Sequence, residues 1–140
     1  MYLLDTNVVS ELRRGVRADA RVRAWADQTP AGQFWLSAVS ILELEIGVLR
    51  MERREPAQGT LLRRWLEEWV LAGFTDRTLA VDTAVARACA RLHVPDPRPD
   101  RDALTAATAL VHGLVVVTRN EADLAGTGAE ALNPWMAPGT

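Results

Sequence analysis

The sequence contains a single cysteine, Cys89, and no lysine. One cysteine excludes a disulfide within the chain, which fits a protein of a reducing compartment. No apolar run reaches the roughly 18 residues that a membrane-spanning helix needs. Asp5 interrupts the apolar start and no basic segment precedes it, so we expect neither a signal peptide nor a membrane anchor. Together these features predict a cytoplasmic protein.

Several kinds of catalytic site lack their residues. The two histidines, His93 and His112, have no cysteine or histidine at metal-binding spacing, and a structural role explains both. The sequence has no G-x-S-x-G serine motif and no glycine-rich phosphate loop. A net charge of −2 excludes attraction of nucleic acid by bulk charge, and the sixteen arginines are only weak evidence for an RNA partner.

Apolar segments of strand length alternate with amphipathic segments of helix length. We expect one domain over residues 1–135 and a loose tail over residues 136–140. The expected strands cover residues 2–4, 33–36, 78–81, 114–118 and 129–132. The expected helices cover residues 8–14, 19–27, 38–54, 61–71, 83–92 and 101–112. This alternation predicts an α/β fold, a three-layer α/β/α domain with a mainly parallel central sheet.

Two details concern the fourth of these helices. Pro56 and Gly59 are expected to break the chain before it begins. Trp65 and Trp69, four residues apart, are expected to share one packed face, in the core or at a dimer interface.

Asp5 follows the first expected strand directly, in the sequence YLLDTN at residues 2–7. Ligands of open α/β sheets bind at the carboxyl ends of the strands, so a carboxylate at this place is a candidate site residue. Thr6 or Asn7 is expected to cap a helix that begins near Val8. The alternative, which Asp5 alone leaves equally open, is that its carboxylate only caps a helix.

Further side-chain oxygens are expected near the same ends of the strands. Asp102 lies in the first turn of a helix, Asn120 and Asp123 follow the strand expected over residues 114–118, and Glu43 and Glu45 lie about two turns into the helix after the second strand. A cluster of carboxylates is costly unless a cation neutralises it. Oxygen ligands without cysteine or histidine select hard ions, so we expect Mg²⁺ or Mn²⁺. Such ions promote phosphodiester cleavage by activating water and clamping the phosphate.

Helical periodicity does not identify which of Glu43 and Glu45 belongs to the site. The neighbours of Glu45 are the more apolar, so the pattern alone singles out Glu45 as a buried charge. The alternative for Glu45 is an ion pair with a nearby arginine such as Arg50 or with a residue of a partner chain. Ser40 and Gly47 leave room beside Glu43 for solvent or an ion.

Several stretches, in their order and spacing, resemble one known family. They are LLDTNVVS at residues 3–10, LSA at 36–38 leading to LEL at 42–44 and Gly47, DALTAATA at 102–109, VTRNEADL at 117–124 and LNPW at 132–135. Each stretch is weak, but together they are specific. From residue 2 to residue 135 the chain resembles the PIN-domain ribonucleases, in particular the VapC-type and FitB-type toxins of bacterial toxin–antitoxin pairs.

The resemblance implies a metal-dependent endoribonuclease that cleaves RNA phosphodiester bonds with metal-activated water. Asp5 and Asp102 match the direct metal ligands of the family, and Glu43 matches a third acid of its site. The fourth family acid matches Asn120, which carries no charge. Asp123, three residues further on, is the stronger candidate for that role, with helix capping as its alternative.

The resemblance also gives roles to neighbouring polar residues. Thr6, Asn7 and Thr118 are expected to orient the metal ligands or the substrate phosphate. Arg119 and Arg13 are candidates to neutralise that phosphate.

Family members are usually homodimers bound to an antitoxin protein whose tail enters the acidic groove. The apolar excess of residues 38–50 and 61–71 marks dimer or antitoxin surfaces. Asn120 keeps open a second function, that of a catalytically weakened binding module acting with an antitoxin. A third function, phosphotransfer with Asp5 as nucleophile, is disfavoured because Asn7 replaces the second aspartate of the Asp-x-Asp pattern.

Overall fold

The computed structural model describes residues 1–136, so all but the first residue of the expected tail lies outside the described residues. Five parallel strands form one sheet in the order β3-β2-β1-β4-β5. Their bounds are Tyr2–Leu4 for β1, Phe34–Ser37 for β2, Thr78–Leu79 for β3, Val115–Val117 for β4 and Ala131–Leu132 for β5. The expected α/β fold with a parallel central sheet is confirmed, and β1 lies in its middle.

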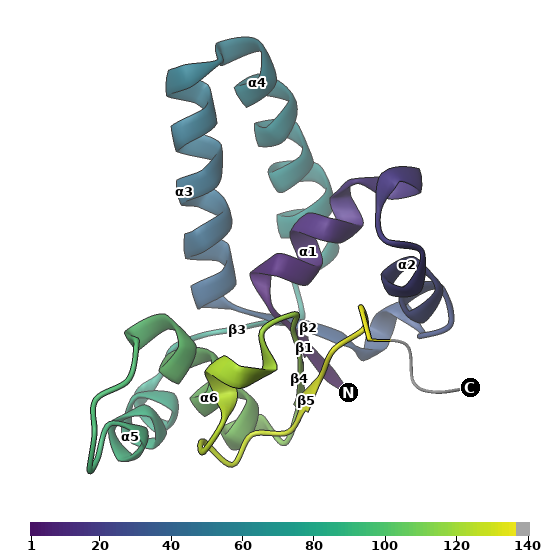
Figure 1. Ribbon diagram of the computed structural model, residues 1–140. Helices are drawn as coiled ribbons and strands as arrows, with labels where there is room; N and C mark the ends of the chain where they lie inside the picture. Colours follow the sequence, from purple (N-terminus) through teal and green to yellow (C-terminus); the bar gives the residue numbers. More distant parts are fainter. Residues whose placement is uncertain (137–140) are drawn as a thin grey trace.

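Helices cover both faces of this sheet, as the expected three layers require (Figure 1). The helices are α1 Thr6–Arg13, α2 Ala20–Asp27, α3 Ala38–Arg54, α4 Pro56–Trp65, α5 Thr83–Leu92 and α6 Asp100–His112. In Figure 1, α3 and α4 stand as a hairpin on the same side as α1, whereas α5 and α6 lie on the other side.

Alternation along β1 builds a separate core on each face. Leu4 packs with Val8, Leu44 and Leu66 in the core beneath α1, α3 and α4. Leu3, which precedes Leu4 in the strand, packs with the α6 alanines on the opposite face. The small α6 residues Ala106 and Ala109 are fully or almost fully buried, which lets α6 lie close to the sheet.

The expected chain break is confirmed just before Pro56, where α3 has ended at Arg54, and it is wrong at Gly59. Pro56 occupies the first turn of α4, where its missing N–H costs nothing, and the helix runs through Gly59. A Cβ on Gly59 would lie 2.4 Å from the Cα of Glu52 on α3. Gly59 is therefore a contact point that lets the two helices of the hairpin approach closely.

Of the two tryptophans expected to pack in the core or at a dimer interface, only Trp65 packs within this chain. Residues Leu66–Leu71 form a π-helical segment that continues α4. Trp65 packs against the core beneath α3 and α4. Trp69 is 72% exposed.

None of the helices within residues 1–136 combines the length and apolar character needed to cross a membrane.

Candidate metal centre

A cleft of about 300 Å³ opens at the carboxyl end of β1, where the chain enters α1. We call it the acid cleft; it is lined by Asp5, Thr6, Asn7, Glu43, Arg101, Asp102, Thr105, Asn120 and Asp123. Its four carboxylates come from four places in the chain: the end of β1, α3, the first turn of α6 and the 3₁₀ turn Glu121–Leu124. The fold thus gathers the predicted acids at the carboxyl end of the central strands.

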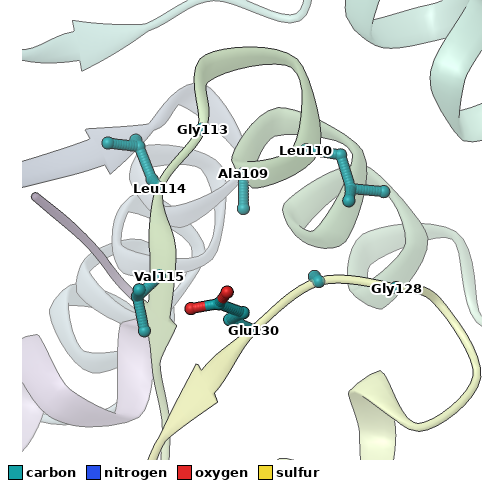
Figure 2. Close-up of a pocket in the computed structure, with 8 residues that line it drawn as sticks. Ala109, Leu110, Gly113, Leu114, Val115, Gly128 and Glu130 are labelled. Atoms are coloured by element: carbon teal, nitrogen blue, oxygen red, sulfur yellow. The ribbon is translucent and has the colours of Figure 1, made fainter.

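The hollow at the amino end of β4 has no comparable cluster of carboxylates in the part of the chain that the structure describes. Figure 2 shows this hollow, between the end of α6 and the segment leading into β5. Apart from Glu130, small and apolar residues line it.

Asp5 caps a helix and also lines the acid cleft. Its Oδ1 accepts a hydrogen bond of 2.9 Å from the backbone N–H of Thr6, so Asp5 is the N-cap of α1. The expectation that Thr6 or Asn7 caps the helix is wrong, because α1 already begins at Thr6. The second oxygen, Oδ2, accepts a hydrogen bond of 2.9 Å from the Thr118 hydroxyl. Capping therefore orients this carboxylate within the cleft.

Thr118 and Asn7 join the chain after β1 to the chain after β4. The Thr118 hydroxyl is buried, and it accepts hydrogen bonds from the Asn7 amide and from the backbone N–H of Asn120. The Asn7 side-chain oxygen accepts a hydrogen bond from the backbone N–H of Arg119. These bonds fix Asp5 and Asn120 relative to each other.

Glu43 belongs to the acid cleft, and Glu45 does not. The Thr6 hydroxyl donates a 2.7 Å hydrogen bond to Glu43 Oε1, and Arg101 Nη1 lies 3.8 Å from Glu43 Oε2. Glu45 forms an ion pair with Arg63 of α4, with 2.7 Å between Oε2 and Nη2. The expected arginine partner of Glu45 exists, but it is Arg63 and not Arg50.

The carboxyl of Asp102 lies close enough to the other acids of the cleft to be affected by their charge. Partial burial raises the pKa of its carboxyl, and the charges of Asp123, Asp5 and Glu43 raise it further. Asp123 contributes more to this repulsion than Asp5 does. A cation bound among these groups would relieve the repulsion.

We expect Asp102→Asn to raise the melting temperature in metal-free buffer at pH 7. An acid whose pKa is raised on folding binds more protons in the folded state, so stability falls as pH rises above the ordinary pKa of 3.8. The asparagine carries no charge and avoids that loss. The melting temperatures of the two proteins in EDTA should differ at pH 7 and converge near pH 3.8. A wild type that melts at or above the variant's temperature at pH 7 would contradict this expectation.

The polar residues predicted to contact substrate divide into two groups. Thr6 and Asn7 line the acid cleft. The Arg119 guanidinium lies over the Trp135 ring, 5.2 Å from its centroid, and Arg119 does not line the cleft. The Arg13 guanidinium likewise lies over Trp65, at 5.7 Å.

Sequence reasoning missed two residues of the cleft, Arg101 and Thr105. Arg101 immediately precedes Asp102, and Thr105 lies three residues after it, on the same face of α6. Helical spacing from Asp102 was therefore a signal for Thr105. No comparable signal distinguished Arg101 from the other fifteen arginines.

The donor set of the acid cleft fits a hard divalent cation. All of its candidate ligands are oxygens, as Mg²⁺ and Mn²⁺ prefer. No three histidine, cysteine, aspartate or glutamate side chains within residues 1–136 stand close enough to hold one ion together. Mg²⁺ usually takes one or two carboxylates and keeps several waters, so it does not require three such side chains around one ion.

Comparison with known proteins agrees with the geometry. The pattern of the PIN domain family matches residues 2–128. The chain is 33% identical to VapC ribonuclease Y4jK of Sinorhizobium fredii, covering 96% of this chain and 98% of the relative. It is 34% identical to Toxin FitB of Neisseria gonorrhoeae, covering 96% and 99%.

A solved structure supports the same assignment. The crystal structure of FitAcB from Neisseria gonorrhoeae superimposes with a TM-score of 0.88 at 33% identity, covering 97% of this chain and 99% of that one. The match therefore extends over the sheet and the helices. The chain belongs to the PIN domain family.

Proposed function

We propose that the protein is a metal-dependent endoribonuclease, the toxin of a toxin–antitoxin pair. This proposal rests on one observation: four carboxylates from distant parts of the chain lie in one cleft, whose candidate metal-ligand atoms are all oxygens. Relatives named VapC ribonuclease and Toxin FitB, similar over nearly the whole chain, support it.

Asp5 and Asp102 are the proposed direct ligands of Mg²⁺ or Mn²⁺, and Glu43 and Asp123 are proposed to act through bound water. The bound ion would supply an activated water for attack on the phosphodiester and neutralise charge on the phosphate. The role of the chain is to hold the carboxylates in place. Thr118 does this for Asp5, and Thr6 does it for Glu43.

Arg101 is the one cation among the residues that line the acid cleft. Its side chain is 53% exposed, and its contact with Glu43 at 3.8 Å is longer than a hydrogen bond. The guanidinium can therefore turn toward a phosphate at little cost. We assign Arg101 to the RNA backbone, the role for which Arg119 was considered from the sequence.

Asp123 is proposed to fill the fourth acid position in place of Asn120. Asp123→Asn should lower the cleavage rate by roughly 10- to 100-fold, as loss of a group supporting a metal site does. Asn120→Ala should lower the cleavage rate by a smaller factor, because Asn120 contributes no charge. Single-turnover cleavage rates of the two variants check this order, and a larger loss for Asn120→Ala would reverse the assignment.

The partners are proposed to be RNA as substrate, an antitoxin protein and a second copy of the chain. The acid cleft suits a basic side chain of an antitoxin, which would pair with the carboxylates. Exposed apolar side chains on the hairpin and its π-helical extension suit protein contacts: Leu42, Leu49, Leu61 and Trp69.

The proposal is tested by incubating purified protein with total RNA in Mg²⁺, in Mn²⁺ and in EDTA. Fragments that form with either ion and not in EDTA are expected, and sequencing them identifies the cleaved RNA. Absence of cleavage with both ions would favour the other candidate function, a binding module without catalysis. The uncharged Asn120 at the family's acid position is the observation that favours that candidate.

A further inference from the structure

A second pocket, of about 220 Å³, opens beside the acid cleft. It lies between α1, α3 and α4, and we call it the side pocket. Thr6 and Glu43 line both hollows. The side pocket is therefore a direct continuation of the acid cleft.

The side pocket has an apolar wall from α3 and α4. Leu44 and Val48 are buried at this wall, and Leu62 and Trp65 are partly buried. Gly47 leaves the wall open, since a Cβ on Gly47 would meet no atom within 4 Å. The wall offers apolar contact to a flat ring.

The other side of the pocket is polar. Ser10 and Arg13 of α1 are both exposed and line it. The Arg13 guanidinium lies over the Trp65 ring, 5.7 Å from its centroid. A guanidinium held in this way presents donors to a phosphate and a planar surface to a base.

We propose that the side pocket binds the nucleotide next to the cleaved phosphodiester, with its base on the apolar wall and its phosphate near Arg13. This inference rests on the proposed ribonuclease function. An RNA strand with one phosphate in the acid cleft must continue out of it, and the side pocket adjoins the cleft through Thr6 and Glu43.

Among the described residues, Arg13 is the one cation that lines the side pocket, and the one acid, Glu43, lies where the pocket joins the acid cleft. A peptide complementary to the acid cleft would carry basic side chains, and Arg13 would repel them. The RNA backbone is negatively charged at each nucleotide, so Arg13 attracts it. The side pocket therefore gives the enzyme a means to prefer particular bases beside the cleaved bond.

The first test removes the base and leaves the protein unchanged. Short oligoribonucleotides carry the sequence that wild type cleaves in total RNA, each with a single abasic position. Removing the base on one side of the cleaved bond should lower kcat/KM by roughly tenfold, as loss of one stacked base does. Removing a base several nucleotides away should change it little.

The second test fills the pocket. Gly47→Leu places a side chain at the lining of the side pocket, where a Cβ meets no atom within 4 Å. Gly73→Leu is the matched control, because Gly73 is an exposed glycine outside both hollows and a Cβ there also meets no atom within 4 Å. Gly47→Leu should lower kcat/KM on the intact substrate by roughly tenfold and abolish the additional effect of the abasic position. Gly73→Leu should behave as wild type, and Gly47→Ala should lie between the two. Thermal melting checks that each variant is folded.

Failure of this inference differs from failure of the proposed function. If wild type cleaves RNA but neither the abasic position nor Gly47→Leu changes kcat/KM, the side pocket does not bind a nucleotide. If Gly47→Leu weakens binding of the antitoxin and leaves RNA cleavage intact, the pocket belongs to a protein partner and the inference is overturned. If wild type cleaves no RNA, the proposed function fails, and this inference fails with it.

Discussion

Asp5→Asn is expected to reduce RNA cleavage by on the order of a hundredfold or more and to leave the fold intact. A cation in such a site supplies several kcal/mol of charge stabilisation in the transition state, and each 1.4 kcal/mol is a factor of ten in rate. The asparagine removes the negative charge at the end of β1. Its remaining side-chain oxygen still accepts the hydrogen bond from Thr6 that caps α1.

This result is measured as the single-turnover cleavage rate at saturating Mg²⁺, together with the melting temperature. Asp76→Asn is the matched control, because Asp76 is exposed and lies in the turn before β3. The control should cleave as wild type does. Cleavage by Asp5→Asn at a comparable rate, in a preparation free of other nucleases, would remove Asp5 from the site.

Gly59→Ala is expected to destabilise the protein by about 1–3 kcal/mol, the usual range for adding a methyl group to a tightly packed contact. The new Cβ would lie 2.4 Å from the Cα and 2.7 Å from the backbone nitrogen of Glu52. Because backbone atoms cannot turn aside as a side chain does, α3 and α4 must separate. The free energy of unfolding in urea measures the loss.

Gly47→Ala is the matched control for this prediction, since Gly47 lies within α3 and a Cβ there meets no atom within 4 Å. In a helix alanine is favoured over glycine by up to about 1 kcal/mol. The two identical substitutions should therefore shift stability in opposite directions. A stabilised Gly59→Ala variant would show that the close approach of α3 and α4 is not needed.

The order of strands and helices could be predicted because each is encoded by a local pattern. The β-branched run before Thr118 became β4, and Ser37 caps α3 as a serine at that position should. The prediction failed where a distant part of the chain decides the local structure. Gly59 reads as a helix breaker in the sequence, but the nearby α3 backbone determines its role.

The π-helical segment shows a related limit. Spacing of four residues predicts that Trp65 and Trp69 lie near one face, but it does not show how much of that face the core covers. The sequence pattern did not indicate the π-helical segment Leu66–Leu71, and Trp69 within it is exposed.

The candidate site was predictable in part. Asp5 was found because it follows a strand, and the sheet brings such residues together at one edge. Glu43 and Glu45 could not be separated by periodicity, since the Arg63 that pairs with Glu45 lies 18 residues away in the next helix. Arg101 was missed because its place in the cleft depends on how α6 meets α3.

The most direct test of the central claim is calorimetric titration of Mn²⁺ into the wild type, Asp5→Asn and Asp102→Asn. Asp5 and Asp102 are proposed to hold the ion, so the wild type should bind Mn²⁺ at a site that both variants lose or greatly weaken. The binding should persist in Asp76→Asn. A wild type that binds no Mn²⁺, or variants that bind it equally well, would contradict the proposal that the acid cleft is a metal centre.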